Sequence, residues 1–170
     1  YGDIWYTQGG ALLAPENGTI DGQDDFDPSK TVVGYTPGTI WQTTVEGWAA
    51  DGKIKEARAT GDQTESIVAL QNGKIDAFLT DSPVVENLMK FQPETLKGLK
   101  LCSNYKDTEA EIGRIAPSVK FGNEDFMKDI NKVVAEMRDE GVLDQIYEKY
   151  GLDPKLHAIT NDQKDNGLNK

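Results

Sequence analysis

The stretch that decides the fold lies at residues 31–41 and reads TVVGYTPGTIW. Its first half is rich in β-branched residues, which is typical of a strand, and Pro37 and Gly38 then supply turn chemistry. A helical pattern follows from Thr39, which suits an N-cap. A strand, a tight turn and a helix N-terminus together leave backbone N–H groups free to bind a carboxylate or a phosphate. The sequence therefore predicts an anion-binding turn at Gly38, Thr39 and Ile40. The alternative is an ordinary strand-to-helix connection, which this stretch by itself favours.

Strand and helix patterns alternate on both sides of this stretch. Further strands are predicted at residues 11–14, 54–59, 75–79, 99–102 and 112–116, and further helices at 63–71 and 82–90. Such alternation is typical of a mostly parallel sheet covered by helices. The predicted fold is therefore an α/β, three-layer lobe with about five strands flanked by helices.

Two amphipathic helices are predicted after residue 123. The first carries an apolar face of Phe126, Ile130, Val133, Val134 and Met137, and the second ends at a glycine, residue 151. Apolar faces of this kind need a surface to pack on, so we expect dimerisation or domain swapping through them. Residues 161–170 are polar and are predicted to be disordered. The predicted organisation is a lobe at 1–118, two C-terminal helices at 119–152 and a polar tail at 153–170.

Composition excludes several classes of function. The net charge of −11, from 29 acidic and 18 basic residues, argues against a nucleic-acid partner. One cysteine and one histidine exclude an intrachain disulfide and a zinc cluster, and His157 is interpreted as a solvated residue. The four aspartates at residues 21–27 lack the ligand series of a calcium loop, so a solvated loop is predicted. Neither a metal nor a cofactor is predicted, and no apolar run is long enough to span a bilayer.

Asp81 is the second chemically interesting residue, because it follows the apolar strand at residues 75–79. Ligands of open α/β sheets bind outside the carboxyl ends of strands, so Asp81 and the anion-binding turn can converge. Amide groups for a carboxylate and an acid for an ammonium suit an α-amino acid. The equally supported alternative is that Asp81 caps the helix that begins at Ser82 and Pro83.

Other catalytic or cofactor motifs have little support. The turn lacks the ending of a P-loop and the glycine spacing of a dinucleotide fingerprint. A single histidine and the absence of G-x-S-x-G argue against a Ser/His/Asp triad. Trp41 and Trp48 lie seven residues apart on one helix face, where they more often belong to the core than to a ligand platform.

Several motifs, in order, resemble a known family. They are VG at residues 33–34 leading to Gly38 and Thr39, ALQNGKIDAF at 69–78 with Asp81, MRDEG at 137–141 and IYEKYG at 146–151. The chain, over about residues 1–152, resembles the extracytoplasmic solute-binding proteins of ABC importers, in the polar amino-acid branch with the type II periplasmic-binding-protein fold. Its start, YGDIWY, is similar to the family's entry into the first hinge strand.

The resemblance implies a two-lobed clamp that closes by hinge motion. Residues 31–110 look like the complete second lobe, residues 11–14 and 112–116 like the hinge strands, and the helices at 123–150 like a part that returns to the first lobe. Most of the first lobe, which supplies an arginine and aromatic residues to the ligand, is missing. The start at Tyr1, without Met or leader, predicts a processed or truncated piece of a longer protein.

The resemblance also implies a function and a ligand site. Thr39 and the amide of Ile40, in the turn after Gly38, would bind the carboxylate of an amino acid, and Asp81 its ammonium group. Trp41 stands where the family often has a polar or small residue that contacts the ligand side chain. The implied protein is not an enzyme: it delivers ligand to an ABC permease, outside the cytoplasm, in the periplasm or on a lipoprotein anchor. The alternatives are a periplasmic dehydratase on the same fold, a receptor's ligand-sensing domain, and a scaffold without a ligand.

Overall fold

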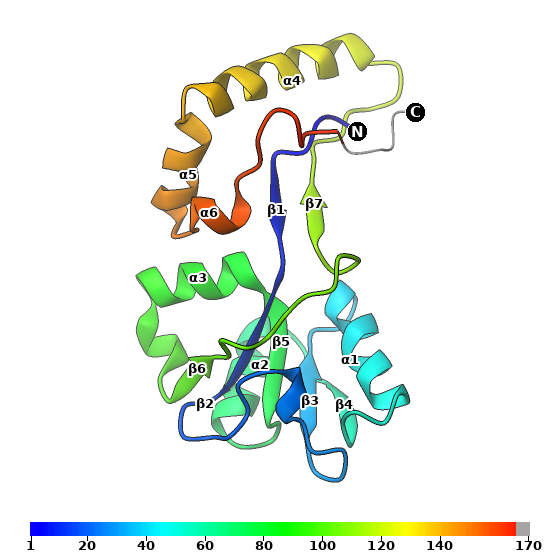
Figure 1. Cartoon of the computed structure of the whole chain (residues 1–170), viewed down its shortest axis with the longest axis vertical. Coiled ribbons are helices and arrows are strands. Elements are labelled where there is room, and N and C mark those ends of the chain that lie inside the picture. Colours follow the sequence, from blue (N-terminus) through cyan, green and yellow to red (C-terminus); the bar gives the residue numbers. More distant parts are fainter. Residues whose placement is uncertain (166–170) are drawn as a thin grey trace. The chain divides into compact units, whose positions relative to one another are not determined.

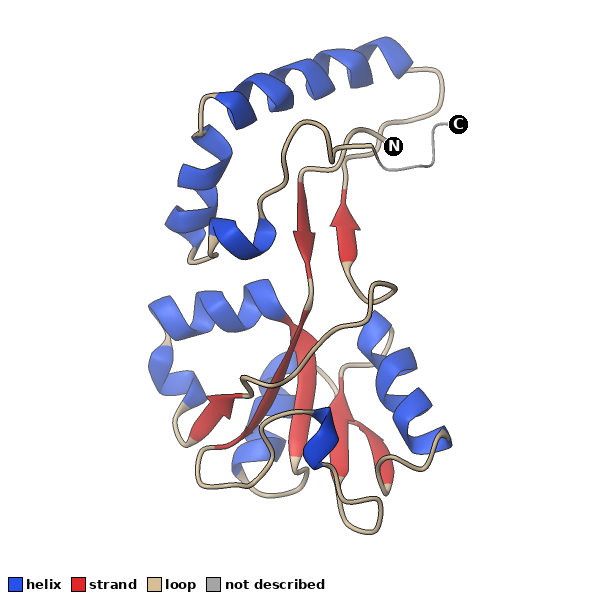
Figure 2. Ribbon diagram, viewed as in Figure 1, coloured by secondary structure: helices blue, strands red, loops and turns tan. Residues whose placement is uncertain are grey.

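The computed structural model describes residues 1–165 (Figures 1 and 2). Contacts divide the chain into two compact units. The larger, unit 2, is Gly9–Glu111, and unit 1 combines Tyr1–Gln8 with the chain from Ile112 onward. Residues 1–8 and 112–118, which the sequence groups with the larger lobe, therefore belong to the same unit as the C-terminal helices.

Unit 2 is built on a five-stranded sheet with the strand order β4-β3-β5-β2-β6. Its elements are β2 (Gly10–Pro15), η1 (Gln23–Asp25), β3 (Val32–Tyr35), α1 (Ile40–Ala50), β4 (Glu56–Ala59), α2 (Gln63–Gln71), β5 (Ala77–Asp81), α3 (Ser82–Phe91), η2 (Pro93–Leu96) and β6 (Leu99–Leu101). Strand β3 pairs in parallel with β4 and β5, whereas β2 is antiparallel to β5 and β6. The predicted α/β sheet of about five strands flanked by helices is confirmed, and the added antiparallel strands make it mixed.

Alternating side chains place a separate core on each face of this sheet. Along β2, Leu12 and Ala14 belong to one cluster and Ala11 and Leu13 to the other, as the period of two in a strand requires. Trp41 and other residues of α1 cover the first face, whereas α2, α3 and η2 cover the second. Burial on both faces explains why the central strands are almost continuously apolar.

Local sequence signals explain several element boundaries of unit 2. Asp62 accepts a hydrogen bond from the backbone of Glu65, and the Glu65 side chain returns one to Asp62, so α2 begins with a capping box. Gly73 ends that helix with a φ of +66°, a value that favours glycine. The carboxylate of Asp76 accepts the Val32 N–H at 2.8 Å, which ties the entry of β5 to the start of β3.

The single cysteine, Cys102, is buried beside the first face of the sheet. Its side chain is a free thiol and belongs to the same apolar cluster as Leu12 and Val33. The backbone N–H of Cys102 donates to Leu12 O at 2.8 Å. Burial raises the pKa of the thiol to about 11, so the sulfur stays protonated at neutral pH.

The acidic loop before β3 is organised by hydrogen bonds. Asp21 accepts bonds from Ser103 and Asn104, and the bonds from Ser103 lower the pKa of its carboxyl group. Asp27 accepts bonds from Ser29, which lower its pKa in the same way. Within residues 1–165, no group of three or more His, Cys, Asp or Glu side chains is arranged to hold a metal ion.

Unit 1 combines a two-stranded antiparallel sheet with three helices among its described residues. Its elements are β1 (Tyr6–Gln8), β7 (Gly113–Ile115), α4 (Glu124–Asp139), α5 (Val142–Tyr150) and α6 (Pro154–His157). Tyr6 pairs with Ile115 across the sheet. Residues 11–14, expected to act as a hinge strand, lie within β2 in unit 2, and the strand beside residues 113–115 is β1 instead.

The predicted apolar face of α4 is only partly buried. Met127 and Val134 are buried, whereas Phe126 and Val133 are 61% and 52% exposed. An exposed apolar face is therefore present on α4, as the sequence predicts. No helix described in residues 1–165 has the length and apolarity needed to cross a membrane.

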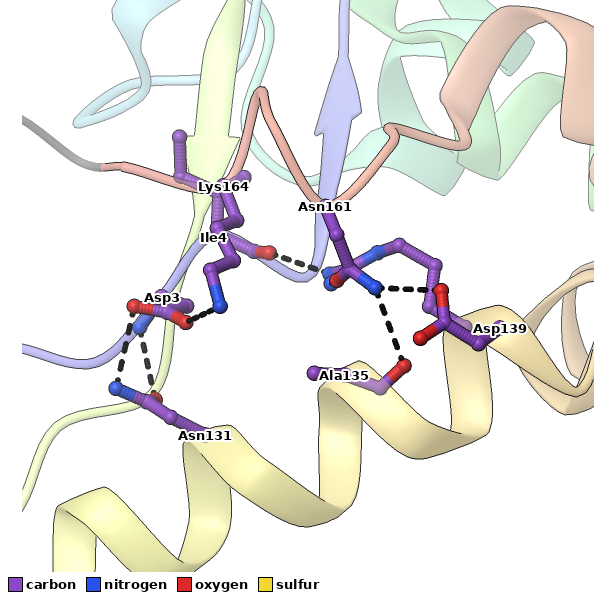
Figure 3. Close-up of polar contacts among 8 residues, drawn as sticks. Asp3, Ile4, Asn131, Ala135, Asp139, Asn161 and Lys164 are labelled. Carbon is purple, nitrogen blue, oxygen red and sulfur yellow. Dashed lines mark hydrogen bonds and ion pairs between the residues drawn. The ribbon is translucent and has the colours of Figure 1, made fainter.

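The C-terminal tail corrects two expectations. His157 is 1% exposed and its Nδ1 lies 2.8 Å from Thr7 O, so it is a buried residue and not a solvated one. The prediction of disorder is wrong for residues 161–165, because polar side chains there find partners on α4 and the N-terminal segment. The Asn161 side chain donates to Ala135 O and Asp139 Oδ1, and Lys164 pairs with Asp3 at 3.2 Å. Figure 3 shows these contacts as dashed lines. Residues 166–170 of the predicted tail lie outside the described residues.

Candidate functional site

The candidate site lies in unit 2, where β3 and β5 end side by side. These strands are parallel neighbours, so their carboxyl ends meet at one edge of the sheet (Figure 1). The turn at residues 36–39 leads from β3 into α1, and Asp81 ends β5 just before α3. The turn at residues 36–39 and Asp81 therefore follow two strands of the same sheet, as their convergence requires.

The turn before α1 uses some of its donors internally. Gly38 has a φ of +80°, which favours glycine, and its N–H donates to Gln42 Oε1 at 3.0 Å. Thr39 occupies the N-cap position without a capping bond, because its hydroxyl donates to Thr36 O at 2.8 Å. The amides of Ile40 and Trp41 begin the helix, where a backbone N–H has no intrahelical acceptor. The helix dipole makes this end favourable for an anion.

Trp41 links the first turn of α1 to the end of β5. Its ring is 1% exposed and belongs to the core cluster, which favours the core alternative over a ligand platform. Its indole Nε1–H donates to Asp81 Oδ1 at 2.9 Å. Two of the residues singled out in the sequence are therefore in direct contact, although they are 40 positions apart.

Asp81 stands at the N-cap position of α3, but its side chain makes no capping bond there. Its carboxylate instead accepts the indole N–H of Trp41 and is half-buried. The capping alternative is therefore not what the structure has. A carboxylate has about four acceptor positions, and the bond from Trp41 uses one of those on Asp81.

Three further residues, which the sequence analysis does not single out, lie around the same ring. Gly10 pairs with Asp81 across β2 and β5. A Cβ atom on Gly10 would lie 2.9 Å from Trp41 Cη2, from the Tyr105 hydroxyl and from Asp107 Oδ1, so only glycine leaves room for these groups. The Gly9–Gly10 doublet before an apolar strand is the one local signal that could have indicated a close approach.

Asp107 fixes the beginning of β2 through hydrogen bonds to its carboxylate. Its carboxylate accepts the Gly10 N–H at 2.9 and 3.0 Å and the Tyr105 hydroxyl at 2.9 Å. Burial raises the pKa of Asp107 despite these bonds, and burial next to that carboxylate raises the pKa of Tyr105 as well. Asp107 therefore fixes the start of β2 beside Asp81, while the amide donors at α1 and the Asp81 carboxylate are the groups with complementary charges at this edge of the sheet.

The chain is similar to named amino-acid-binding proteins. It is 25% identical over 142 residues to a protein of Campylobacter jejuni named a probable histidine-binding protein, a match that covers 84% of this chain and 51% of the relative. It is 29% identical over 142 residues to the L-cystine-binding protein TcyJ of Escherichia coli, covering 82% of this chain and 48% of the relative. The chain therefore spans about half the length of these curated relatives.

The chain is also similar to the solved structure of an amino-acid-binding protein. An ancestral arginine-binding protein, solved with glutamine bound, matches with a TM-score of 0.63 and 26% identity. The match covers 88% of this chain and 62% of that protein. Residues 29–153, more than half of the chain, match the family described as bacterial extracellular solute-binding proteins, family 3. The chain belongs to this family of solute-binding proteins.

Proposed function

We propose that this chain binds an α-amino acid as the substrate-capturing component of an ABC importer. The observation that carries the proposal is the hydrogen bond between Trp41 and Asp81. This bond joins the first turn of α1, with its free amides, to a carboxylate at the end of β5. An α-amino acid carries the two complementary charges.

Each part of the site has its own role in this proposal. The amides of Ile40 and Trp41, after the turn at Gly38, bind the ligand carboxylate, and the Thr39 oxygen retains lone pairs for a ligand donor. Asp81 binds the ligand ammonium group through a charge-assisted hydrogen bond. A carboxylate here disfavours a phosphate, because like charges repel. The role is capture and release, with no bond of the ligand broken.

The wider role is proposed from the family. The ligand passes to an ABC permease in the membrane, and the protein works outside the cytoplasm, in the periplasm or on a lipoprotein anchor. The names of the two curated relatives, both binding proteins, support a receptor over an enzyme. Because the chain spans about half of their length, the ligand and the permease are proposals for the whole protein.

Titration calorimetry of the chain with a panel of twenty amino acids, with inorganic phosphate as a further arm, tests the proposal. We expect heat from one class of amino acid and none from phosphate. Silence across the amino-acid panel would overturn amino-acid binding by this chain, and turnover of arogenate or prephenate would favour the dehydratase.

Asp81→Ala is the variant that tests the site. We expect it to weaken amino-acid binding by about 2 kcal/mol, because the ligand ammonium group loses its charged partner. Asp51→Ala is the matched control, since Asp51 is an exposed acid at the other end of α1, where it pairs with Lys53. Equal affinities in wild type and Asp81→Ala would contradict the role of Asp81.

We also propose that the exposed face of α4, which includes Phe126 and Val133, mediates dimerisation or domain swapping of this chain. Light scattering across a concentration series tests this proposal. A monomer at every concentration would contradict it.

A further inference from the structure

We propose that Trp41 is a positioning residue of the amino-acid site, which acts on the ligand through Asp81 and does not touch it. This inference rests on the proposed function and adds to it how the carboxylate is held. Three observations carry it: the burial of the indole ring, its hydrogen bond to Asp81, and the bare backbone of Gly10 beside it.

The burial of Trp41 separates it from the ligand. The ring is 1% exposed, so an entering ligand cannot stack on it. Its neighbours in the apolar cluster include Leu12, Val45 and Leu79, and they fix the position of the ring within α1 and the sheet. The only polar atom of the ring is Nε1, and that atom faces Asp81 Oδ1 at 2.9 Å.

The glycine at position 10 makes this placement possible. Gly10 lies opposite Asp81 in the register of β2 and β5. A Cβ atom at position 10 would lie 2.9 Å from Trp41 Cη2, closer than real carbon contacts allow. The indole therefore occupies the space that a side chain on β2 would take, and from there its N–H reaches the next strand.

The consequence for Asp81 is a fixed carboxylate. Asp81 ends its strand and makes no capping bond to α3, and the indole N–H of Trp41 is a donor that orients its side chain. A neutral donor on Oδ1 leaves the negative charge of Asp81 in place to attract an ammonium group. Holding the carboxylate before the ligand arrives lowers the ordering cost of binding.

A double-mutant cycle on the 170-residue chain tests the inference, with the affinity for the best-binding amino acid of the panel as readout. Trp41→Phe keeps an aromatic ring and removes the N–H, and we expect an affinity loss of about tenfold. In the Asp81→Ala background the same change should cost less than about twofold, because the group through which Trp41 acts is gone. Equal losses in the two backgrounds would overturn the inference.

Trp48→Phe is the matched control. Trp48 lies on the same helix and packs against Phe26 with ring centroids 5.2 Å apart, whereas Asp81 accepts its indole bond from Trp41. We expect an unchanged affinity. A loss as large as that of Trp41→Phe would show a general effect of aromatic packing and would count against the inference.

A second readout needs no ligand. In ¹H–¹⁵N spectra, the indole N–H of Trp41 should exchange slowly with solvent in wild type and faster in Asp81→Ala, while Asp81→Asn keeps an acceptor oxygen and retains the slow exchange. Identical exchange in wild type and Asp81→Ala would overturn the inference even if Trp41→Phe fails to fold. Failure of the wild type to bind any amino acid, with this exchange pattern intact, would overturn the proposed function and leave the indole–carboxylate contact standing.

Discussion

Unit 2 and unit 1 are each stabilised internally by a different kind of contact. Unit 2 buries two apolar clusters, one on each face of a five-stranded sheet, and its largest buried side chains are aromatic and aliphatic. In the described part of unit 1, the buried apolar side chains are Ile4, Met127, Val134 and Tyr147. Many of its other contacts are polar, as Figure 3 shows for Asp3, Asn131 and Lys164. The candidate site, with amides and carboxylates fixed in place, lies in the unit that has the larger apolar core.

The difference has an energetic meaning. Burial of apolar surface is the main stabilising contribution to folding, whereas a single hydrogen bond contributes only about 1 kcal/mol net. Among the described residues, unit 1 buries fewer apolar side chains than unit 2. We therefore expect unit 2 to be the more stable unit and unit 1 to unfold first when the protein is destabilised.

Phe78→Ala should have the largest effect, because Phe78 is fully buried at the centre of the second cluster. We expect unit 2 to lose about 3–5 kcal/mol of stability, measured by urea unfolding with tryptophan fluorescence. Val68→Ala, at an exposed position of α2, should change stability by less than about 0.5 kcal/mol. A loss below 1 kcal/mol for Phe78→Ala would break the comparison, since the apolar core would then contribute little.

Arg138→Met should have a smaller effect, confined to unit 1. The guanidinium group of Arg138 donates to Ile4 O at 2.8 Å and to Asn161 Oδ1, and methionine keeps much of the apolar stem. We expect unit 1 to lose about 2 kcal/mol, seen as faster hydrogen exchange in α4. Arg114→Met, at an exposed position of β7, is the control and should leave exchange unchanged. Faster exchange in unit 2 alone would contradict the prediction.

Asp107→Asn should have the smallest effect, visible only as a change in pH dependence. Burial raises the pKa of Asp107 above its unfolded value of about 4, so the protonated form stabilises the fold below that pH. This stabilisation is lost as the pH rises through the folded pKa. We therefore expect Asp107→Asn to gain stability relative to wild type as the pH rises from about 4 to 7, in urea unfolding at each pH.

Asp27→Asn provides a control of opposite sign for the pH series. Hydrogen bonds from Ser29 lower the pKa of Asp27, so its stabilisation is present above the unfolded pKa and lost as the pH falls. This variant should therefore lose stability relative to wild type as the pH rises. The same trend in both variants would contradict the assignment of Asp107.

Local sequence patterns predict much of unit 2. The run at residues 31–41 forms β3, its turn and α1, because β-branched residues, a positive-φ glycine and an N-cap position coincide there. The helix predicted at residues 63–71 is α2 with those bounds, since a capping box and a glycine mark its ends. Such signals are contained within a few neighbouring residues and can therefore be recognised without knowledge of the fold.

The parts that depend on long-range contacts could not be predicted in this way. Asp107 and Gly10 are 97 positions apart, and nothing near either residue indicates that they are bonded. His157 is followed by a polar tail, yet its ring is buried against the backbone of Thr7. In each case the partner comes from a distant strand, so the role of the residue appears only when the sheet has formed.

The burial of Cys102 gives the protein a built-in reporter of its own opening. The chain has one thiol, and that thiol is only 4% exposed, with a pKa raised to about 11. An alkylating reagent reacts with the thiolate and needs access to it, so the folded unit 2 should resist labelling. Each labelled molecule has therefore opened at least once, so that the cluster on the first face of the sheet was exposed to the reagent. The rate of thiol labelling can thus follow the opening of unit 2 without any introduced probe, and a ligand that binds at the end of the same sheet should slow it.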